Sequence, residues 1–351
     1  MNEILEKYHN DGWLIKQVHP TKDLTIWNYS RKVQYERLWD DITLQCRGWI
    51  TNSKGEIVSR SFKKFFNMEE LTPSQIPNES FEVTEKMDGQ LGLLFWYEDE
   101  WIFASRGSFT SVYAEKGRQL LEKYDYKKLT HDCTYIFEII FKEGRIVCKY
   151  DFEDLILIGC INIVFGFEVN IHSEWFENRA GFKVVKKYDG INDFKVLKTM
   201  VANDAEGYVV RFRSGLRMKI KGDEYCRLHS IITKISSRDV WRHLKEGLPI
   251  EDLLHDVPDE FDKWVKEQTQ TFSITYQIID GNCQIKYFNE IEPIKNLSRK
   301  EVAAKILTFD KSLQPIFFHM YDGKDYSHLI WDKLYPPYSK PFNKNDEEGD
   351  N

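Results

Sequence analysis

Short runs of strand-forming residues, separated by turn residues, fill the chain from its start to about Ile231. They are rich in Ile, Val, Phe and Tyr, which pack well on a pleated surface. Clear examples are TYIFEIIF, RIVCKY, LILIGCINIVF, GYVVRF and RMKIK. This spacing, together with a hairpin signal in Tyr97–Trp101, predicts mostly antiparallel sheets. The helical spacing of apolar residues in Ser111–Tyr124 predicts a helix beside them.

The pattern then changes, and three segments have helical character: SSRDVWRHLKEG, DEFDKWVKEQTQTFSITYQIIDGNCQIKYFNEI and SRKEVAAKILTFDK. Ser298 and Glu301 have the spacing of a capping box, which predicts the start of the last helix. The predicted fold class is therefore α+β. We expect antiparallel sheets with flanking helices over residues 1–235 and an α-helical C-terminal domain over 236–340. The Pro-rich, acidic end predicts a disordered tail over 341–351.

The formal net charge of −7 would normally count against a nucleic-acid partner, but the excess acid is confined to the C-terminal portion. Residues 1–250 hold 37 Lys and Arg against 37 Asp and Glu, whereas residues 251–351 hold 12 against 19. Within the neutral part, Val209–His229 carries six basic residues against two acidic ones. Because a local basic stripe can attract phosphates, this segment predicts a phosphate-binding surface.

Membrane insertion and disulfide formation are not expected. No apolar run approaches the ~20 residues that span a bilayer, and the first residues lack the basic start and apolar core of a signal peptide. The six cysteines are scattered without a CxxC pair, which is typical of buried, reduced thiols and not of a metal site. We therefore expect a soluble, cytoplasmic protein with no membrane partner.

The stretch TEKMDGQLGLLF places Lys86, Asp88 and Gly89 in an otherwise apolar run. Asp-Gly before an apolar run is typical of a hairpin turn, which is the simplest interpretation. A lysine at a strand end can also be a nucleophile toward phosphorus. It must first lose its proton, and nearby cations or a metal ion can lower its pKa. The stretch alone leaves both interpretations open.

Further charged residues lie on other predicted strands. Lys219 and Lys221 are two residues apart and so point to the same face of a strand. An anion between them would offset their repulsion, and a solvated edge strand is the simpler alternative. Glu138 lies inside an apolar strand, where a carboxylate needs a partner such as a structural ion pair. Glu206 precedes Gly207 at the mouth of another strand, so the chain has the cations and carboxylates that such a lysine requires.

The ordered set resembles the covalent nucleotidyltransferase superfamily of ATP-dependent ligases and mRNA capping enzymes: Lys86-x-Asp88-Gly89, Glu138, Glu206-Gly207 and Lys219-x-Lys221. A closer resemblance, from about Arg47 to His229, is to the RNA ligase 1 family, the T-even phage type of RNA-repair ligase. It rests on LQCRGWI, SRSFKKFFNMEE, TEKMDGQ, ASRGSF, FEIIFKEGRIVCKY, EGYVVRF and MKIKGDEYCRLH. The upstream RG and KFFN blocks distinguish this family from DNA ligases and capping enzymes.

The resemblance implies a nucleotidyltransferase (adenylation) domain and a catalytic role for each matching residue. Lys86 would be the nucleophile that becomes joined to AMP, and Asp88 would orient it or the metal ion. Glu206 would assist the metal ion, which makes Glu206 and Asp88 the implied metal-binding pair. Lys219 and Lys221 would bind the phosphates and stabilise the charge that develops on them.

The resemblance also implies a nucleotide-binding set. Arg47 and Lys64 would handle the ATP phosphates, and Glu138 would hold the ribose. Arg106 stands where the phage-type enzyme has a lysine, which keeps the charge but changes the geometry. The complete implied set is Arg47, Lys64, Phe66, Glu85, Arg106, Glu138, Glu206, Lys219 and Lys221, with ATP and Mg²⁺ (or Mn²⁺) as cofactors.

A member of this family would be an ATP-dependent RNA ligase that joins a 3′-OH end to a 5′-phosphate through a covalent lysyl-AMP. Family analogy implies RNA repair, with cleaved tRNA as one substrate, and we expect a monomer. The C-terminal portion lacks the β-rich pattern of the oligonucleotide-binding fold that DNA ligases and capping enzymes append, which favours an RNA ligase. A capping-type guanylyltransferase or DNA ligase, and a non-catalytic RNA-binding module, are the alternatives.

Overall fold

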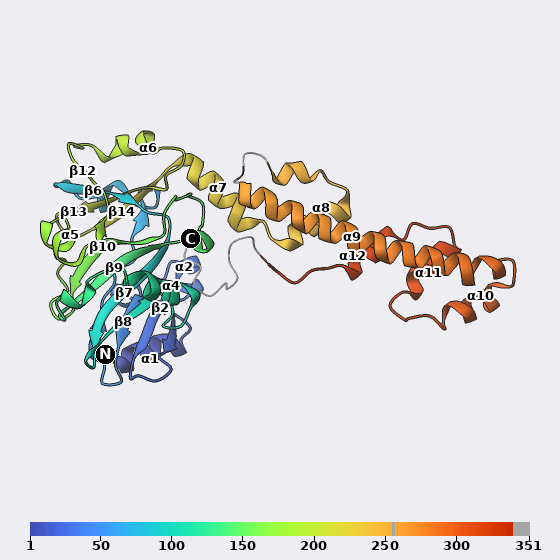
Figure 1. The fold of residues 1–351 in the computed structure, drawn as a ribbon, viewed down its shortest axis with the longest axis horizontal. Helices are drawn as coiled ribbons and strands as arrows, with labels where there is room; N and C mark the ends of the chain where they lie inside the picture. The colour runs from blue at the N-terminus through green and yellow to red at the C-terminus, as the bar shows by residue number, and fades with distance from the viewer. Residues whose placement is uncertain (255–256, 258, 340–351) are drawn as a thin grey trace. The chain divides into compact units, whose positions relative to one another are not determined.

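The computed structural model describes residues 1–254, 257 and 259–339 (Figure 1). The chain forms two compact units, Met1–Arg227 and a second that begins at Leu228. Sheets with flanking helices make up the first unit, and helices make up the second, as the sequence pattern predicts. The tail predicted over 341–351 lies outside the described residues.

Three β-sheets form the framework of the first unit. The N-terminal sheet has the order β1-β2-β3-β4, with β1 (Leu14–Val18), β2 (Thr25–Tyr29), β3 (Arg47–Thr51) and β4 (Ile57–Ser59). The central sheet has the order β11-β10-β9-β7-β8, with β7 (Gln90–Tyr97), β8 (Glu100–Ser105), β9 (Cys133–Ile140), β10 (Asp154–Asn162) and β11 (Lys183–Val184). The third sheet has the order β12-β6-β13-β14-β5, with β5 (Phe66–Asn67), β6 (Phe81–Lys86), β12 (Lys187–Tyr188), β13 (Gly207–Phe212) and β14 (Arg217–Lys221). These pairings are antiparallel except β10–β11 and β14–β5.

Short helices flank these sheets. They are α1 (Asn2–Asn10), α2 (Arg31–Glu36), α3 (Asp41–Gln45), α4 (Val112–Leu121), α5 (Glu174–Ala180) and α6 (Leu197–Met200), while α7 (Asp223–Lys234) crosses the boundary between the units. The helix predicted over Ser111–Tyr124 is confirmed as α4, which Ser111 caps by accepting a hydrogen bond from the Ala114 N–H. The predicted hairpin at Tyr97–Trp101 is also confirmed. Glu98 and Asp99 have positive φ angles of 48° and 63°, as a two-residue hairpin turn requires.

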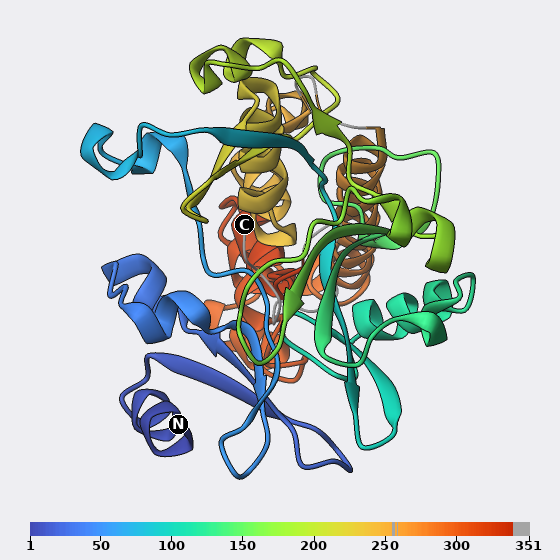
Figure 2. The ribbon, with the colours of Figure 1, turned by 90° about the vertical axis from the view of Figure 1, so that its left-hand side faces the viewer.

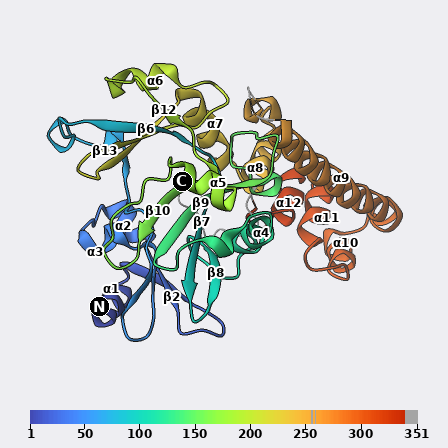
Figure 3. The ribbon, with the colours of Figure 1, turned by 60° about the vertical axis from the view of Figure 1, so that its left-hand side comes forward.

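In Figures 2 and 3 the N-terminal and third sheets lie at opposite ends of the first unit, and the central sheet lies between them. Leu93 of the central sheet shares a core with Ile50 of the N-terminal sheet. Val83, Val210 and Met218 form a separate core on one face of the third sheet. Since successive residues of a strand point to opposite faces, the third sheet presents polar side chains on its other face.

The stretch TEKMDGQLGLLF is not a single strand or a hairpin. β6 ends at Lys86 in the third sheet, and β7 begins at Gln90 in the central sheet, so these two strands are not paired with each other. The Asp-Gly turn interpretation is therefore wrong, because the chain crosses from one sheet to the next at this point. Gly89 permits the crossing, since a Cβ atom there would lie 2.7 Å from the Ile139 carbonyl oxygen.

The strand predicted for RIVCKY, residues 145–150, is also wrong. The Val147 and Cys148 N–H groups donate hydrogen bonds of 2.8 and 2.7 Å to the Asp88 carboxylate instead of joining a sheet. A side chain distant in the sequence thus satisfies the backbone groups that a neighbouring strand would otherwise satisfy.

The second unit contains α8 (Ser237–Glu246), α9 (Asp259–Glu290), α10 (Arg299–Ile306), α11 (Gln314–Tyr321) and α12 (Ser327–Lys333). The predicted capping box is confirmed: Ser298 accepts a hydrogen bond from the Glu301 N–H at the start of α10. Buried Val302, Ile306 and Phe317 pack in one core along α9. The helices therefore have a core of their own.

The thiols are unpaired, as predicted, but not all are buried. Five of the six cysteines are buried, whereas Cys226 is exposed on α7. Across the described part of the chain, no helix is long and apolar enough to span a membrane.

Candidate active site

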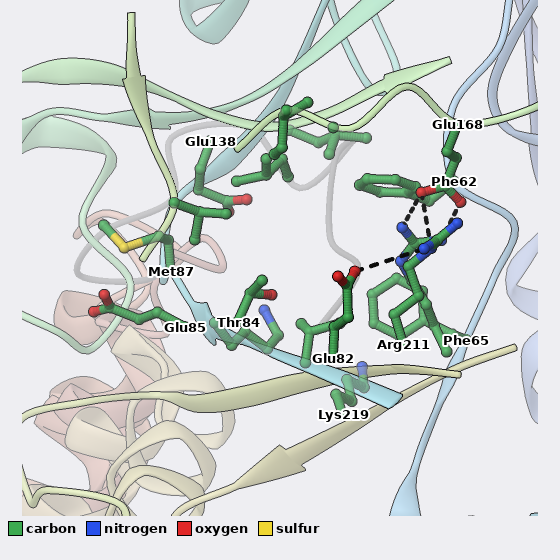
Figure 4. Close-up of a pocket in the computed structure, with 18 of the residues that line it drawn as sticks. Phe62, Phe65, Glu82, Thr84, Glu85, Met87, Glu138, Glu168, Arg211 and Lys219 are labelled. Atoms are coloured by element: carbon green, nitrogen blue, oxygen red, sulfur yellow. Dashed lines mark hydrogen bonds and ion pairs between the residues drawn. The ribbon is translucent and has the colours of Figure 1, made fainter. Parts of the chain in front are cut away.

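The polar face of the third sheet forms the floor of a cavity of about 620 Å³ (Figure 4). From one end to the other, this face carries Lys86, Gly207 and Lys221, then Thr84, Val209 and Lys219, then Glu82, Arg211 and Arg217. The same alternation that buries Met218 therefore directs a row of charged side chains into the cavity.

Glu206, which directly precedes β13, bridges two amines at one end of this face. Its Oε2 accepts a hydrogen bond of 2.9 Å from Lys86 Nζ, and its Oε1 lies 3.1 Å from Lys221 Nζ. Burial opposes the charged form of Glu206, but the two lysines outweigh it and lower the pKa of this carboxyl group. Burial likewise lowers the pKa of Lys86, but Glu206 and Glu138 raise it by more. In this arrangement Lys86 is held as an ammonium ion.

Lys219 has a different electrostatic environment from Lys86. Burial, followed by the nearby charges of Lys86, Lys221 and Lys64, lowers the pKa of Lys219 to about 7. An amine of this kind is only partly charged at neutral pH. A bound anion would restore its charge, so this position favours the binding of a phosphate group.

Glu138 on β9 faces the cavity from the central sheet, across from Lys219 in Figure 4. Its Oε1 accepts a hydrogen bond of 3.1 Å from the Gly89 N–H, and burial raises its pKa to about 7. Glu138 therefore finds a hydrogen-bond partner in the backbone of the Lys86-x-Asp88-Gly89 motif. The Glu138 side chain also lines the cavity, where Lys86 and Arg47 favour its charged form.

Asp88 is enclosed by hydrogen bonds. Its carboxylate is 3% exposed and accepts three of them: Oδ2 from the Val147 and Cys148 N–H groups, and Oδ1 from the Tyr225 hydroxyl group at 2.7 Å. The Asp88 N–H donates to the Tyr150 hydroxyl at 2.9 Å. Sequence reasoning missed both tyrosines. Asp88 thereby ties the backbone beside Lys86 to two distant segments.

The upstream basic residues of the predicted set also line the cavity. Arg47 lies over the Phe65 ring at 6.0 Å, and Lys64 donates a hydrogen bond of 3.3 Å to the Tyr29 hydroxyl. Arg106, which follows β8, lines the cavity as well. The structure therefore gathers cations from the N-terminal and central sheets above the floor.

Two predicted nucleotide-binding residues have less direct positions. Phe66 does not line the cavity but packs edge-on against Trp39, and Phe62 and Phe65 line it instead. Glu85 touches the cavity, yet strand alternation places its side chain on the opposite face from Lys86. Within the KFFN block it is therefore Phe65, and not Phe66, that lines the cavity.

A second charged cluster lies at the far end of the floor. Its two arginines belong to the basic segment Val209–His229, but sequence reasoning missed their carboxylate partner, Glu168. The Glu168 carboxylate accepts a bidentate pair of hydrogen bonds from the Arg217 guanidinium and lies 3.2 Å from Arg211 Nε (Figure 4). Arg217 also stacks over Phe62, at 4.2 Å from its ring centroid. We call Glu168, Arg211 and Arg217 the arginine cluster.

These residues fit a nucleoside triphosphate with a divalent cation. Mg²⁺ is usually bound by one or two carboxylates together with substrate phosphates. Glu206 offers such a carboxylate once it releases one of its two lysines, whereas the Asp88 carboxylate already accepts three hydrogen bonds. Within residues 1–254, 257 and 259–339, no group of three or more His, Cys, Asp or Glu side chains could hold a metal ion alone. Phosphate oxygens would therefore have to complete the coordination.

Comparison with known proteins gives a consistent result. A family model described as RNA ligase matches residues 45–225, slightly more than half of the chain. A protein of Autographa californica nuclear polyhedrosis virus, provisionally named a bifunctional polynucleotide kinase/RNA ligase, is 29% identical over 245 residues, which are 59% of this chain and 33% of that protein. A Thermovibrio ammonificans protein provisionally named an RNA ligase is 29% identical over 204 residues, 54% of each chain.

Among solved structures, one described as an archaeal ATP-dependent RNA ligase has a TM-score of 0.50 and 14% identity, and covers 93% of this chain and 96% of that one. This likeness concerns the fold alone. The chain spans about a third and about half of the length of the two curated relatives.

Proposed function

Because the chain belongs to the RNA ligase family, we propose that it joins RNA 3′-OH and 5′-phosphate ends in an ATP-dependent reaction through a covalent lysyl-AMP on Lys86. The observation that supports this proposal best is the pair of ion-pair contacts through which Glu206 bridges Lys86 and Lys221, beside Lys219 and over one cavity. A nucleophile, phosphate-binding cations and a metal-binding carboxylate are thereby combined in one place.

Lys86 must lose a proton before it can attack. In the first step its Nζ forms a bond to the α-phosphorus atom of ATP, and the bond from that atom to the pyrophosphate breaks. The contact with Glu206 keeps Lys86 protonated, so this carboxylate has to exchange Lys86 for another cation first. The pKa of Lys86 then falls through burial and the neighbouring charge of Lys221.

Lys219 and Lys221 are well placed to bind the phosphates and to stabilise the negative charge that develops during transfer. Magnesium held by Glu206 and the phosphates would supply electrophilic assistance at the phosphoryl oxygens. Arg47, Lys64 and Arg106 would neutralise the pyrophosphate, and Glu138 would hold the ribose. We assign Asp88 a positioning role, since its oxygen atoms already accept three hydrogen bonds.

The following two steps use the same groups. AMP is transferred from Lys86 to the RNA 5′-phosphate, and attack by the 3′-OH then forms the phosphodiester and releases AMP. We further propose a cytoplasmic location, because the six thiols form no disulfide. By family analogy, we propose a role in RNA repair, with cleaved tRNA as one substrate. We also propose that residues 1–235 form the adenylation domain and that residues 236–340 form a helical domain.

The experiment is incubation with labelled ATP or GTP and Mg²⁺, followed by a ligation panel of nicked, single-stranded and stem-loop RNAs with 5′-phosphate ends. We expect one AMP on the protein, no GMP, and sealing of RNA. A GMP adduct would favour a capping-type enzyme, and sealing of DNA alone would favour a DNA ligase. A folded protein without any adduct would favour a non-catalytic module.

A further inference from the structure

A short turn at the end of β10 exposes two aromatic rings. Phe165 is 79% exposed and Phe167 is 55% exposed, and their rings stack on each other at 6.2 Å. Val164 beside them is 70% exposed. Apolar side chains that project together from the surface usually mark a contact site.

The turn that carries these rings is held firmly in place. The buried Asn162 side chain accepts hydrogen bonds from the Val164 and Phe165 N–H groups at 3.1 and 2.9 Å. The Asn162 N–H donates to the Phe167 carbonyl at 2.9 Å, and Gly166 provides the positive φ of 73° that the turn needs. The two rings are therefore presented by ordered backbone, so their exposure is a property of the fold.

The residue that follows these rings is Glu168, the carboxylate of the arginine cluster. Arg211 and Arg217 lie directly opposite each other on β13 and β14, where two like charges repel. The Glu168 carboxylate occupies the space between them, with the geometry in which guanidinium groups bind a phosphate. Arg217 is two residues from Lys219 on the same strand, about 7 Å away.

We infer that the turn and the arginine cluster form the docking surface for a single-stranded RNA end, an inference that rests on the proposed function. RNA bases stack on Phe165 and Phe167, and a backbone phosphate displaces the Glu168 carboxylate from between Arg211 and Arg217. Aromatic rings beside arginines are the usual means of binding single-stranded nucleic acid. Glu168, Arg211 and Arg217 line the cavity that also holds Lys86, so a strand bound at the arginine cluster leads toward Lys86.

The charges around the turn favour RNA over a protein partner. Arg213 also lines the cavity, and Arg60 donates a hydrogen bond of 2.6 Å to the Ile163 carbonyl beneath the turn. Four carboxylates lie near these groups: Glu168 and Glu82 contact the arginines, Glu79 lies near Arg213, and Asp132 accepts a hydrogen bond of 3.1 Å from the Asn162 side-chain amide. Glu82 also pairs with Lys187 at 2.7 Å. Movement of Glu168 would free the Arg217 guanidinium and leave Arg211 with the longer contact to Glu82, so a phosphate could take the place of the Glu168 carboxylate.

The first test is Glu168→Gln, with binding of a short fluorescein-labelled, 5′-phosphorylated oligoadenylate measured by anisotropy. A purely structural ion pair predicts unchanged or weaker RNA binding in this variant. Removal of a competing carboxylate instead predicts binding that is about tenfold tighter. In Arg217→Gln, the slope of log affinity against log salt should become less steep by about 0.7, the value for one phosphate contact on a single strand.

The second test is Phe165→Ala combined with Phe167→Ala, with Phe288→Ala as the matched control. Phe288 lies on α9, is 71% exposed, and has no role in the proposal. We expect the double variant to bind the oligoadenylate at least about tenfold more weakly, since each stacked base contributes strongly, and the control to bind as the wild type does.

Sealing of a pre-adenylylated RNA, which bypasses the reaction with ATP, should fall in parallel with this binding. Adduct formation and sealing by the wild type test the proposed function. If the wild type performs both but the variants bind RNA as the wild type does, the docking surface fails and the proposed function stands. Unchanged RNA binding by the folded double variant, or binding by Glu168→Gln that is no tighter than that of the wild type, would overturn the inference. The exposed rings would then be assigned to a protein partner.

Discussion

Glu206 and Glu168 have the same geometric arrangement at opposite ends of one sheet face, since each carboxylate lies between two cations. At the Glu206 end the cations are Lys86 and Lys221, and the carboxylate is 2% exposed. At the Glu168 end they are Arg211 and Arg217, and the carboxylate side chain is 20% exposed. The two ends differ in the kind of cation and in the access of water.

The difference separates chemistry from binding. A lysine amine that loses its proton becomes a nucleophile, whereas a guanidinium group stays charged at any physiological pH and can only bind. Deep burial at the Glu206 end makes the pKa values sensitive to each neighbour. The more open Glu168 end suits a polymer that must enter and leave. Changes at the Glu206 end should therefore affect the covalent chemistry, and removal of the second unit should leave it in place.

The largest effect is expected for Lys86→Arg, which converts the lysine end into an arginine end. The charge next to Glu206 is retained, but no amine is available to attack phosphorus, so the covalent AMP adduct should be abolished. Mass spectrometry after incubation with ATP should show one added AMP on the wild type and none on the variant. Lys116→Arg is the control, because Lys116 is similarly exposed and pairs with Glu153 at 2.7 Å outside the cavity. An adduct on Lys86→Arg, or on Lys86→Ala, would end the proposal.

Glu206→Ala and Lys219→Ala should each slow adenylylation by about a hundred- to thousand-fold, or roughly 3–4 kcal/mol, because groups directed at transition-state charge are removed. Single-turnover transfer of labelled AMP measures this rate. Glu153→Ala provides a matched control outside the cavity for the loss of an ion-paired glutamate. Rates within a few-fold of the wild type for both variants would place the site elsewhere.

A smaller effect is expected from pH. The pKa of Lys219 is about 7 in this structure, and phosphate binding favours its charged form. The charge is already present below pH 7, whereas above pH 7 binding must take up a proton. Affinity for a non-hydrolysable ATP analogue should therefore fall by up to about tenfold for each pH unit above 7.

Calorimetry from about pH 6 to about pH 9 measures this dependence, with Lys219→Arg as the comparison. The arginine stays charged, so the proton uptake on binding should decrease by about one. Glu138, whose pKa is also about 7, accounts for the slope that remains in the variant. Equal slopes in the two proteins would show that Lys219 is not the group that titrates.

The smallest effect is expected from removing the helical unit. Glu206 and Glu168 both lie within Met1–Arg227, and the helices from Ser237 onward have a core of their own. A chain ending at Ser236 should therefore form the lysyl-AMP at a rate within a few-fold of the full chain. It should lose efficiency on structured RNA more than on a short linear strand. A truncated protein that circular dichroism shows to be folded, but that forms no adduct, would place part of the nucleotide site in the second unit.

Much of the lysine end could be predicted from the sequence. Glu138 is a charged residue within an otherwise apolar strand, which is a costly pattern that chemistry can explain. Lys86 and Lys219 lie on strands where charged and apolar residues mix, and their motif spacing carries the signal. Their order along the chain matched a family, and the structure places them around one cavity. A charge in an unfavourable local context is a strong signal even in a single sequence.

The contacts of Asp88 could not be predicted. Its partners Cys148 and Tyr225 are 60 and 137 residues away, and RIVCKY has the composition of a strand although its N–H groups bind this carboxylate. The resemblance implies Phe66 through the KFFN block, whereas Phe65 lines the cavity. β5 has only two residues, too few to define which side chain faces the cavity. Long-range hydrogen bonds and very short strands leave no periodic pattern.

The arginine end was predicted only as part of the basic segment Val209–His229, without its carboxylate or its aromatic turn. Arg211 and Arg217 resemble ordinary surface arginines on an alternating strand, and nothing in EVNIHS indicates that Glu168 would reach them. Phe165 belongs to an apolar run that predicts a buried strand, yet the Asn162 turn brings it to the surface. A turn held by one side chain can reverse the burial of the residues next to it.

The position of Cys226 offers a practical way to observe this chemistry. It is the one exposed thiol of the six, and it follows Tyr225, whose hydroxyl donates to Asp88 beside the nucleophile. Burial of part of the side chain raises the pKa of the Cys226 thiol, so a maleimide dye would attach most readily at mildly alkaline pH. A fluorophore attached there would lie on α7 close to Lys221, and its emission could follow nucleotide entry in real time without mutation of any other cysteine.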